Sequence, residues 1–305
     1  MTDAAVTAPG VSWFSRLKDS RVGPVSFMIL VIMVIWYAGA VYLNAPRVIE
    51  QFERGKVQWT ASQLMDKAWS MKRPILPAPH QVAVELNKTI FQKKITSKRS
   101  LVFHAWITTS STLLGFAMGG LLGILLAAGI VHVRTLDRSL MPWIIASQTI
   151  PILAIAPMIV VVLGNLGLTG VIPKAIISMY LCFFPVAIGM VKGLRSPDPL
   201  QMDLMRTYSA STSQIFWNLR WPSSVPFLFA SLKVAVAISL VGAIVGELPT
   251  GAVAGLGARL LAGSYYGQTV QIWSALVVAS VLGMALVYTI GLIEKFTLKA
   301  MGAKS

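Results

Sequence analysis

Charged residues and cysteines are scarce in this chain of 305 residues. Only 12% of the residues are charged, whereas 55% are apolar and the mean hydropathy is +0.71. Soluble domains carry about 25% charged residues, so the composition excludes an ordinary water-soluble globular domain. The single cysteine, Cys182, excludes an intrachain disulfide and leaves the compartment undetermined.

Acidic residues are fewer than basic ones, 11 against 26, which gives a net charge of +15. Such an excess can indicate nucleic-acid binding, but here the basic residues lie between long apolar runs. Contact with the anionic head groups of a lipid bilayer is the better interpretation, and no nucleic-acid partner is expected.

Long apolar stretches recur along the chain, and each is near the roughly 20 residues that a helix needs to cross a bilayer. They cover residues 25–43, 113–131, 143–163, 171–191, 225–245 and 272–293. Helices are predicted because lipid offers no partner for free backbone N–H and C=O groups. Pro151, Pro157 and Pro226 predict broken or kinked helices that lie against other protein. The fold class is therefore all-α, a membrane protein of about six transmembrane helices.

The first apolar stretch allows two interpretations. Arg16, Lys18 and Arg21 precede it, and Ala38-Gly39-Ala40 has the pattern of a signal-peptide cleavage site. The apolar run continues to Leu43, however, which is long for a signal peptide. Retention as a transmembrane span is the favoured interpretation.

The order of apolar and charged segments predicts a division of the chain. Residues 1–24 form a polar cytoplasmic tail, 25–43 the first transmembrane helix, 44–104 a charged periplasmic or interfacial connection, 105–295 a five-span core and 296–305 a cytoplasmic tail. Apolar residues recur at helical spacing in the connection, as at Leu64, Met65 and Trp69. This pattern fits either amphipathic helices on the head groups or a solvated helix pair.

Basic residues in the short loops favour one orientation. With the N-terminus inside, the inner short loops hold six basic residues against two, Lys174 and Arg259, in the outer ones. The six are Arg134, Arg138, Lys192, Arg195, Arg206 and Arg220. Because short cytoplasmic loops are enriched in lysine and arginine, both termini are predicted to lie inside.

Small residues four apart mark close helix contacts. Gly115, Gly119 and Gly123 share one helix face, as do Gly242 and Gly246. Such spacing lets helix backbones approach closely, either within one subunit, which is favoured, or between two subunits.

The loop 193–222 between the fourth and fifth spans carries the most informative pattern. Ser196-Pro-Asp-Pro199 predicts a helix start, after which Leu200, Leu204, Met205 and Tyr208 share one face. Ser209–Ser213 is a small, polar break, and Ile215, Phe216 and Leu219 form a second short apolar face that ends at Trp221-Pro222. Two short helices of this kind suit a groove on another protein, or they pack on the membrane surface.

The stretch from Asp203 to Pro222 resembles the loop signature of inner-membrane permeases of binding-protein-dependent ABC importers. That signature reads Glu-Ala-Ala, three residues, Gly, nine residues, Ile, one residue, Leu-Pro. Here Ser209 stands at the Gly position, Leu219 at the Ile and Trp221 at the Leu. Asp203 replaces Glu and Leu204-Met205 replace Ala-Ala.

The rest of the core is similar to the nitrate, sulfonate and taurine branch of this family. Matching segments, in order, are Leu76–Pro79, Thr112–Phe116, Gln148–Pro157, Phe184-Pro185, Gly193–Ser196, Gly242–Glu247 and Gly255–Gly257. The resemblance covers roughly residues 74–295 and implies a type I ABC importer permease-like core of five spans plus one N-terminal span. Residues 44–73 look like an insertion relative to this branch, and no function follows for them.

The resemblance implies a transport subunit of the bacterial inner membrane that is not itself an enzyme. The chain lacks the G-x-x-x-x-G-K-[ST] loop that holds nucleotide phosphates, so ATP hydrolysis is expected on a separate ABC ATPase pair. A second permease subunit, in a homodimer, and a periplasmic substrate-binding protein complete the implied assembly. No cofactor or metal is expected.

The implied roles fall on two groups of residues. The ATPase-coupling group comprises Asp203, Tyr208, Ser209, Ala210, Ser211, Ile215 and Pro222. The candidates for the translocation path are Glu247, Lys233, Gln148, Thr149, Asn165 and Ser239. For Glu247 a structural role beside Arg259 or backbone amides is the alternative, for Lys233 an interfacial position, and for the neutral residues interhelical hydrogen bonds. His104 is interpreted as interfacial.

Two other classes of function remain open at this point. A stand-alone secondary transporter or channel would be expected to show inverted repeats, and none is visible. A membrane-embedded enzyme would need clustered His, Asp or Glu within spans, which one Glu247 does not supply. The expected solute is small and anionic, like nitrate, a sulfonate or taurine.

Overall fold

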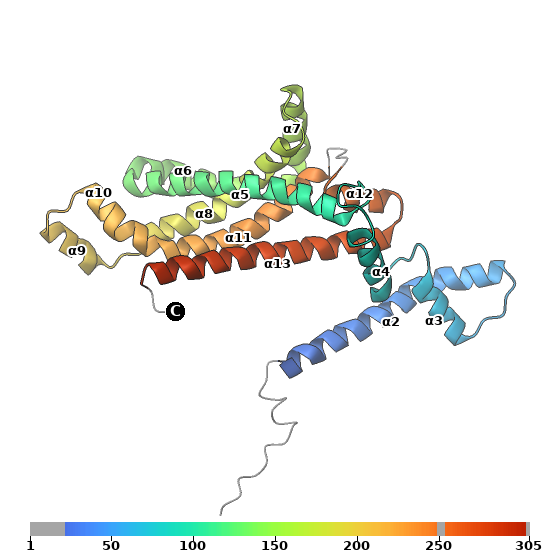
Figure 1. Cartoon of the computed structure of the whole chain (residues 1–305). Coiled ribbons are helices and arrows are strands. Elements are labelled where there is room, and N and C mark those ends of the chain that lie inside the picture. The colour runs from blue at the N-terminus through green and yellow to red at the C-terminus, as the bar shows by residue number, and fades with distance from the viewer. Residues whose placement is uncertain (1–21, 249–253, 303–305) are drawn as a thin grey trace, which may run out of the picture. The chain divides into compact units, whose positions relative to one another are not determined.

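The computed structural model describes residues 22–248 and 254–302 (Figure 1). The described residues are helical, with no strand among them, as the composition predicts. The chain divides into two compact units, Met1–Glu85 and Leu86–Ser305, and each unit is described by itself.

In the first unit a long helix, α2 (Val22–Arg54), carries a short helix, α3 (Ala61–Ser70), on its C-terminal half. At 1.5 Å per residue α2 is about 50 Å long, more than the roughly 30 Å of hydrocarbon in a bilayer. The stacked Phe52–Trp59 and edge-on Tyr37–Trp69 ring pairs show that α3 runs back along α2. α2 passes without a break through Ala38–Ala40, where Ala40 is fully buried.

Asn44 fixes the segment after α3 against α2. Its side chain is fully buried, donates to the carbonyls of Ala68 (3.2 Å) and Leu76 (2.9 Å), and accepts the N–H of Ile75 (2.7 Å). A buried amide in an apolar helix would be costly without these partners. Because all of them lie in residues 68–76, the amide determines where this segment can sit.

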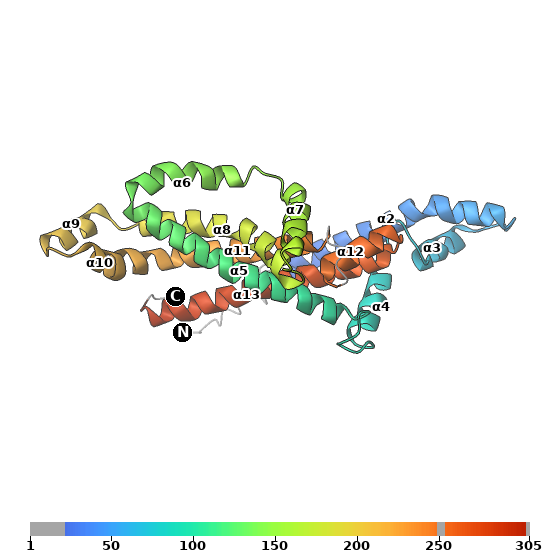
Figure 2. The same cartoon turned by 90° about the horizontal axis from the view of Figure 1, so that it is seen from above.

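The second unit begins within α4 (Pro79–Ile90) and is built on four long helices: α5 (Leu101–His132), α8 (Val171–Leu194), α11 (Trp221–Glu247) and α13 (Thr269–Ala300). α5, α8 and α11 run side by side in both views (Figures 1 and 2). Ala127, Cys182, Val186, Met190 and Ala235 lie in their shared core.

The glycines of α5 explain how closely α5 and α8 approach. A Cβ on Gly115 or Gly119 would overlap Ser178 or Cys182 of α8, and one on Gly123 would lie 2.8 Å from the Phe183 carbonyl oxygen. The close contact predicted from this glycine spacing is therefore made within one subunit.

Replacing Gly119 by valine is expected to destabilise the bundle by about 3 kcal/mol, since the added atoms meet both the α8 backbone and Cys182. Gly164, whose Cβ would meet nothing within 4 Å, supplies the control, and Gly164→Ala should keep or slightly raise stability, because alanine favours a helix over glycine. Thermal unfolding in detergent measures both. An unchanged melting temperature in Gly119→Val would contradict the close packing.

A helix pair with a sharp bend replaces the third predicted span. α6 (Arg134–Ser147) and α7 (Ile152–Asn165) meet at 99°, and α7 turns away from the long helices in Figure 1. Pro151 lies at the break and has no N–H to continue the helix. Counting this pair as one span gives six candidate membrane spans, and without it five, so the prediction of about six is confirmed.

Short helices occupy the two ends of the bundle (Figures 1 and 2). α9 (Pro199–Thr207) and α10 (Thr212–Ile215) form a hairpin at one end, and α12 (Leu256–Tyr265) lies at the other. A π-helical turn, Phe216–Arg220, joins α10 to α11 without a break. The helix end predicted at Trp221-Pro222 does not occur. Pro222 follows directly on this π-helical turn and lies inside one continuous helix that runs from Thr212 to Glu247.

Candidate functional site

Local hydrogen bonds cap both helices of the α9–α10 hairpin. The Asp198 carboxylate accepts the N–H of Leu200 at 2.8 Å, at the helix start predicted from the Pro-Asp-Pro pattern. Ser211 caps α10 by accepting the N–H of Gln214 at 3.3 Å. Each cap satisfies a backbone N–H that has no partner within its helix.

Ser209 makes the turn between the two helices. Its φ is +53°, a left-handed conformation that suits glycine and is uncommon for other residues. The N–H of Ser209 donates to the Arg206 carbonyl (2.8 Å) and the N–H of Ala210 to the Met205 carbonyl (3.0 Å), which closes the end of α9. The position aligned with the family's glycine therefore has the backbone conformation that explains a glycine there.

The hairpin presents apolar side chains to its surroundings. Leu200 and Leu204 of α9 and Tyr208, which follows it, are 77%, 56% and 78% exposed. Asp203 and Ser211 are exposed too, and Asp203 pairs with Arg206 at 3.1 Å. Ala210, Ile215 and Pro222 are half-buried. A cluster of large exposed apolar residues on a small element marks a contact surface.

The base of the hairpin is tied to the bundle. Phe216 packs on His132 and Trp217, with ring centroids 5.0 Å apart in each pair, and Trp221 lies 5.8 Å from Trp217. The Arg220 guanidinium donates to the Leu194 carbonyl at the end of α8 (3.3 Å). Together with the unbroken α10–α11 connection, these contacts let a displacement of the hairpin reach α11.

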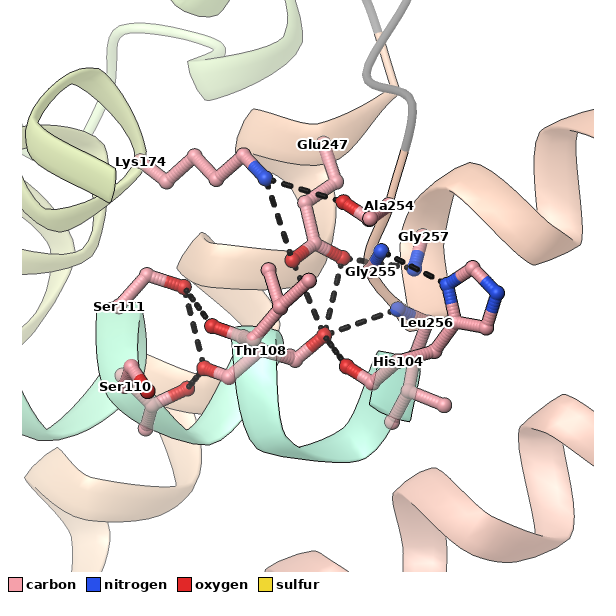
Figure 3. Close-up of polar contacts among 12 residues, drawn as sticks. His104, Thr108, Ser110, Ser111, Lys174, Glu247, Ala254, Gly255, Leu256 and Gly257 are labelled. Atoms are coloured by element: carbon pink, nitrogen blue, oxygen red, sulfur yellow. Dashed lines mark hydrogen bonds and ion pairs between the residues drawn. The ribbon is translucent and has the colours of Figure 1, made fainter. Parts of the chain in front are cut away.

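Glu247 is the last residue of α11, about 40 Å along the helix from Trp221 at 1.5 Å per residue. Its side chain is fully buried, and Figure 3 shows its polar contacts. The Thr108 hydroxyl of α5 lies 3.0 and 3.1 Å from the two carboxylate oxygens. The N–H of Gly257 donates to Glu247 Oε2 at 2.8 Å, and Lys174 Nζ lies 3.7 Å from Oε1. Glu247, Thr108, Lys174 and His104 are called the carboxylate cluster below.

The carboxylate cluster holds the start of α12. Lys174 donates to the Ala254 carbonyl (3.1 Å), and the Thr108 hydroxyl accepts the N–H of Leu256 (2.8 Å). His104 Nδ1 accepts the N–H of Gly255 (2.9 Å), so its other nitrogen carries the proton and donates to the Lys98 carbonyl (3.0 Å). Side chains from α5, α8 and α11 thus fix one short backbone segment.

Gly255 allows this segment to lie on the carboxylate. Its φ is +131°, a conformation that other residues rarely adopt, and a Cβ there would overlap the Glu247 carboxylate. A side chain at this position would displace either the loop or Glu247.

The sequence singles out Glu247 and names Arg259 or backbone amides as alternative partners, and Gly257 supplies such an amide. The sequence does not indicate the side-chain partners Thr108 and Lys174. His104, interpreted as interfacial, is only 2% exposed and lies inside the protein. Lys174, counted among outer loop charges, is 6% exposed within α8. The available signal was the spacing of His104, Thr108 and Thr112, which places polar groups on one face of an apolar helix.

The neutral path candidates are not brought together with Glu247. Gln148 and Thr149 are exposed at the bend between α6 and α7, and Asn165 is exposed at the end of α7. Ser239 is fully buried between helices, where it donates to the Thr112 carbonyl (2.9 Å) and contacts the Ser178 hydroxyl (2.6 Å).

Lys233 of α11 forms an ion pair with Glu294 of α13. The Lys233 side chain is 36% exposed and the Glu294 side chain 20%. Glu294 follows the last apolar stretch, and sequence reasoning did not single it out. The pair joins α11 to α13 at a point that is nearer to the hairpin than the carboxylate cluster is.

Comparison with known proteins adds a family to this geometry. Residues 119–294 match the family described as "Binding-protein-dependent transport system inner membrane component". This match contains the hairpin and two members of the carboxylate cluster, Lys174 and Glu247, while His104 and Thr108 lie before its first residue.

Individual relatives are similar over much of their length. The chain is 33% identical to the formylaminopyrimidine transport permease protein ThiX of Halalkalibacterium halodurans, over 60% of this chain and 68% of that one. It is 27% identical to the riboflavin transport system permease protein RibX of Chloroflexus aurantiacus, over 96% and 95%. A putative aliphatic sulfonates transport permease protein, SsuC of Bacillus subtilis, is 22% identical over 74% and 78%.

Proposed function

Because the chain belongs to the inner membrane components of binding-protein-dependent transport systems, we propose that two copies of it form the solute path of an ATP-driven importer. The chain is a multi-pass ABC transporter permease subunit and not itself an enzyme. The proposed partners are an ABC ATPase pair in the cytoplasm and a substrate-binding protein in the periplasm. Family membership sets aside the stand-alone transporter or channel.

The α9–α10 hairpin is the observation that supports coupling to an ATPase. It combines exposed Leu200, Leu204 and Tyr208 with a base fixed to α8 and α11. An apolar hairpin of this kind can bury its surface in a groove on a partner protein. We propose that residues 203–222 sit in the ATPase and transmit its closure to α11.

The charges of the bundle support a bacterial inner-membrane location with both termini in the cytoplasm. The start of α6 and the C-terminal ends of α8 and α13 carry basic residues and lie at the hairpin end of the bundle, seen in Figure 2. Those basic residues are Arg134, Arg138, Lys192, Arg195, Lys295 and Lys299. Such a concentration is typical of the cytoplasmic side.

Co-purification tests the importer assembly. The tagged chain, solubilised from its own membrane, is expected to retain an ATPase subunit, and Tyr208→Asp should release it by placing a charge in the apolar contact. Ser305→Asp, which adds the same charge elsewhere in the chain, is the control. Recovery of the chain without any ATPase under mild conditions would contradict the proposal.

The path candidates divide by their surroundings. Gln148, Thr149 and Asn165 are exposed in one subunit, which fits a path lined where two subunits meet. Ser239, Lys233 and Glu247 are engaged within the subunit, and we propose that they shape the path by holding α11 in place.

Charge reversal separates two roles for Lys233. Lys233→Glu is expected to reduce uptake at least about tenfold, because it faces Glu294 with a like charge. If the pair acts by joining α11 to α13, adding Glu294→Lys restores much of the uptake. If Lys233 attracts an anionic solute, the double variant stays as inactive as Lys233→Glu. Uptake of the radiolabelled solute in proteoliposomes measures the difference.

Two classes of solute are proposed. The first is a small anion such as nitrate, a sulfonate or taurine, supported by the likeness to a sulfonate permease. The second is a heterocyclic vitamin or precursor, supported by higher identity to permeases named for formylaminopyrimidine and riboflavin. Thermal-shift measurements on the partner binding protein, with taurine, nitrate, riboflavin and formylaminopyrimidine in parallel, distinguish the two.

A further inference from the structure

Residues 44–73, which include the end of α2, have no role in the proposed importer function, and they form a cationic cavity. The cavity measures about 590 Å³ and lies between α2, α3 and the segment that follows α3. Four basic side chains, Arg47, Lys67, Lys72 and Arg73, line it. The other lining residues are neutral, and no acidic residue is among them.

Hydrogen bonds to the backbone hold these like charges together. Asn44 holds residues 75–76 against α2, and Gln81 donates to the Met71 carbonyl at 3.0 Å. The backbone on both sides of Lys72 and Arg73 is thereby fixed beside Arg47. Within the described part of the chain, no ion pair joins any of the four basic residues to an acidic one. Their mutual repulsion favours an anion from outside the chain.

The position along α2 places the cavity at the depth of the lipid head groups. Arg47 follows the end of the apolar stretch at Leu43 by four residues, about 6 Å along the helix. α3 presents two different faces. Met65 and Trp69 line an apolar groove with α2, whereas Lys67 and Ser70 line the cationic cavity. A helix with one apolar and one cationic face lies in the membrane interface.

We propose that this cavity binds the phosphate-bearing head group of an anionic phospholipid. Arg47 and Arg73 can each bind a phosphate through two parallel N–H groups, and Lys67 and Lys72 add compact positive charges. A bound lipid offsets the repulsion among the four side chains and ties the α2–α3 pair to the membrane surface. The proposal concerns residues 44–73 alone and does not depend on transport.

Native mass spectrometry of the full chain in detergent tests this site. Phosphatidylglycerol and phosphatidylcholine with the same acyl chains are titrated in parallel. The chain is expected to bind phosphatidylglycerol at least about tenfold more tightly. The variant Arg47→Gln/Lys67→Gln/Lys72→Gln/Arg73→Gln should lose this preference, and Arg47→Lys/Arg73→Lys should keep most of it.

A matched variant controls for net charge. Lys93→Gln/Lys94→Gln/Lys98→Gln/Arg99→Gln removes as many basic residues from the loop before α5 and should keep the preference. A preference that survives the cavity variant with its fold intact by circular dichroism would overturn the proposal. If inorganic phosphate competes with phosphatidylglycerol for the cavity as well as the lipid itself does, the cavity binds free anions instead. If the cavity variant instead loses binding to the substrate-binding protein while its lipid preference is unchanged, the cavity binds an acidic protein surface. Either of these last two results would overturn the lipid site.

Discussion

Ser209→Pro is expected to abolish assembly of the permease with its ATPase, whereas Ser209→Gly is expected to be tolerated. Ser209 has a φ of +53°, and the proline ring fixes φ near −65°, so proline must reopen the turn between α9 and α10. Proline also removes the N–H that donates to the Arg206 carbonyl. Glycine adopts the left-handed conformation without strain and should stabilise the turn by about 1 kcal/mol. Pull-down of the ATPase by each tagged variant is the measurement.

Lys56 provides the control for this experiment. It has a φ of +51°, lies between α2 and α3, and is remote in sequence from the hairpin. Lys56→Pro imposes the same backbone conflict in another turn, and ATPase binding should persist. Normal ATPase binding by Ser209→Pro would refute the proposed role of the hairpin turn.

Lys174→Met is expected to destabilise the permease by about 3 kcal/mol or more, because it leaves the buried Glu247 carboxylate without its positive partner. The segment from Ala254 also loses its bond to the ammonium group. Adding Glu247→Gln removes the unpaired charge while an amide can still accept the N–H of Gly257. The double variant should therefore recover much of the lost stability. Thermal unfolding in detergent, alongside solute uptake, measures the effect.

The exposed pair Arg54–Glu50 is the matched comparison. Its atoms lie 2.6 Å apart, yet both side chains are more than half exposed, so Arg54→Met should cost less than about 1 kcal/mol. A Lys174→Met variant as stable as the unmodified protein would contradict the structural importance of the carboxylate cluster. So would a double variant no more stable than Lys174→Met.

The apolar runs predict the helical architecture because membrane depth allows few other backbone structures. Prolines correctly predict the break between α6 and α7, where Pro151 stands at the helix start. Pro222 predicts a second break that does not exist, because the helix continues through it after the π-helical turn Phe216–Arg220. A proline shows where an N–H is missing and leaves open whether the helix breaks there.

Glu247 stands out in the sequence because a carboxylate in an apolar stretch is rare, but its partners come from distant segments. Thr108 lies 139 residues away, and Lys174 is drawn in from the start of α8. No local pattern reveals which charges meet across helices. Asn44 illustrates the same limit, since its four hydrogen bonds go to backbone groups of Ala68, Ile75 and Leu76, which no local pattern identifies.

The hairpin predicted between the fourth and fifth spans has the expected first helix, because Asp198 and Pro199 specify its start locally. The positive φ of Ser209 could be expected only from the glycine at this position in the family signature, because serine itself rarely adopts this conformation. The exposed apolar residues of the hairpin have no partner within the described residues of this chain. This is the physical reason to expect a partner on another protein.

The central claim is that the α9–α10 hairpin faces the cytosol, where it receives force from an ATPase. Tyr208→Cys in a Cys182→Ala background, exposed to a membrane-impermeant maleimide, tests it directly. Spheroplasts should leave this thiol unlabelled, and inverted vesicles stripped of ATPase should label it fully. Phe91→Cys, in the loop at the opposite end of α5, should show the reverse pattern. Labelling of Tyr208→Cys in intact spheroplasts would contradict the account.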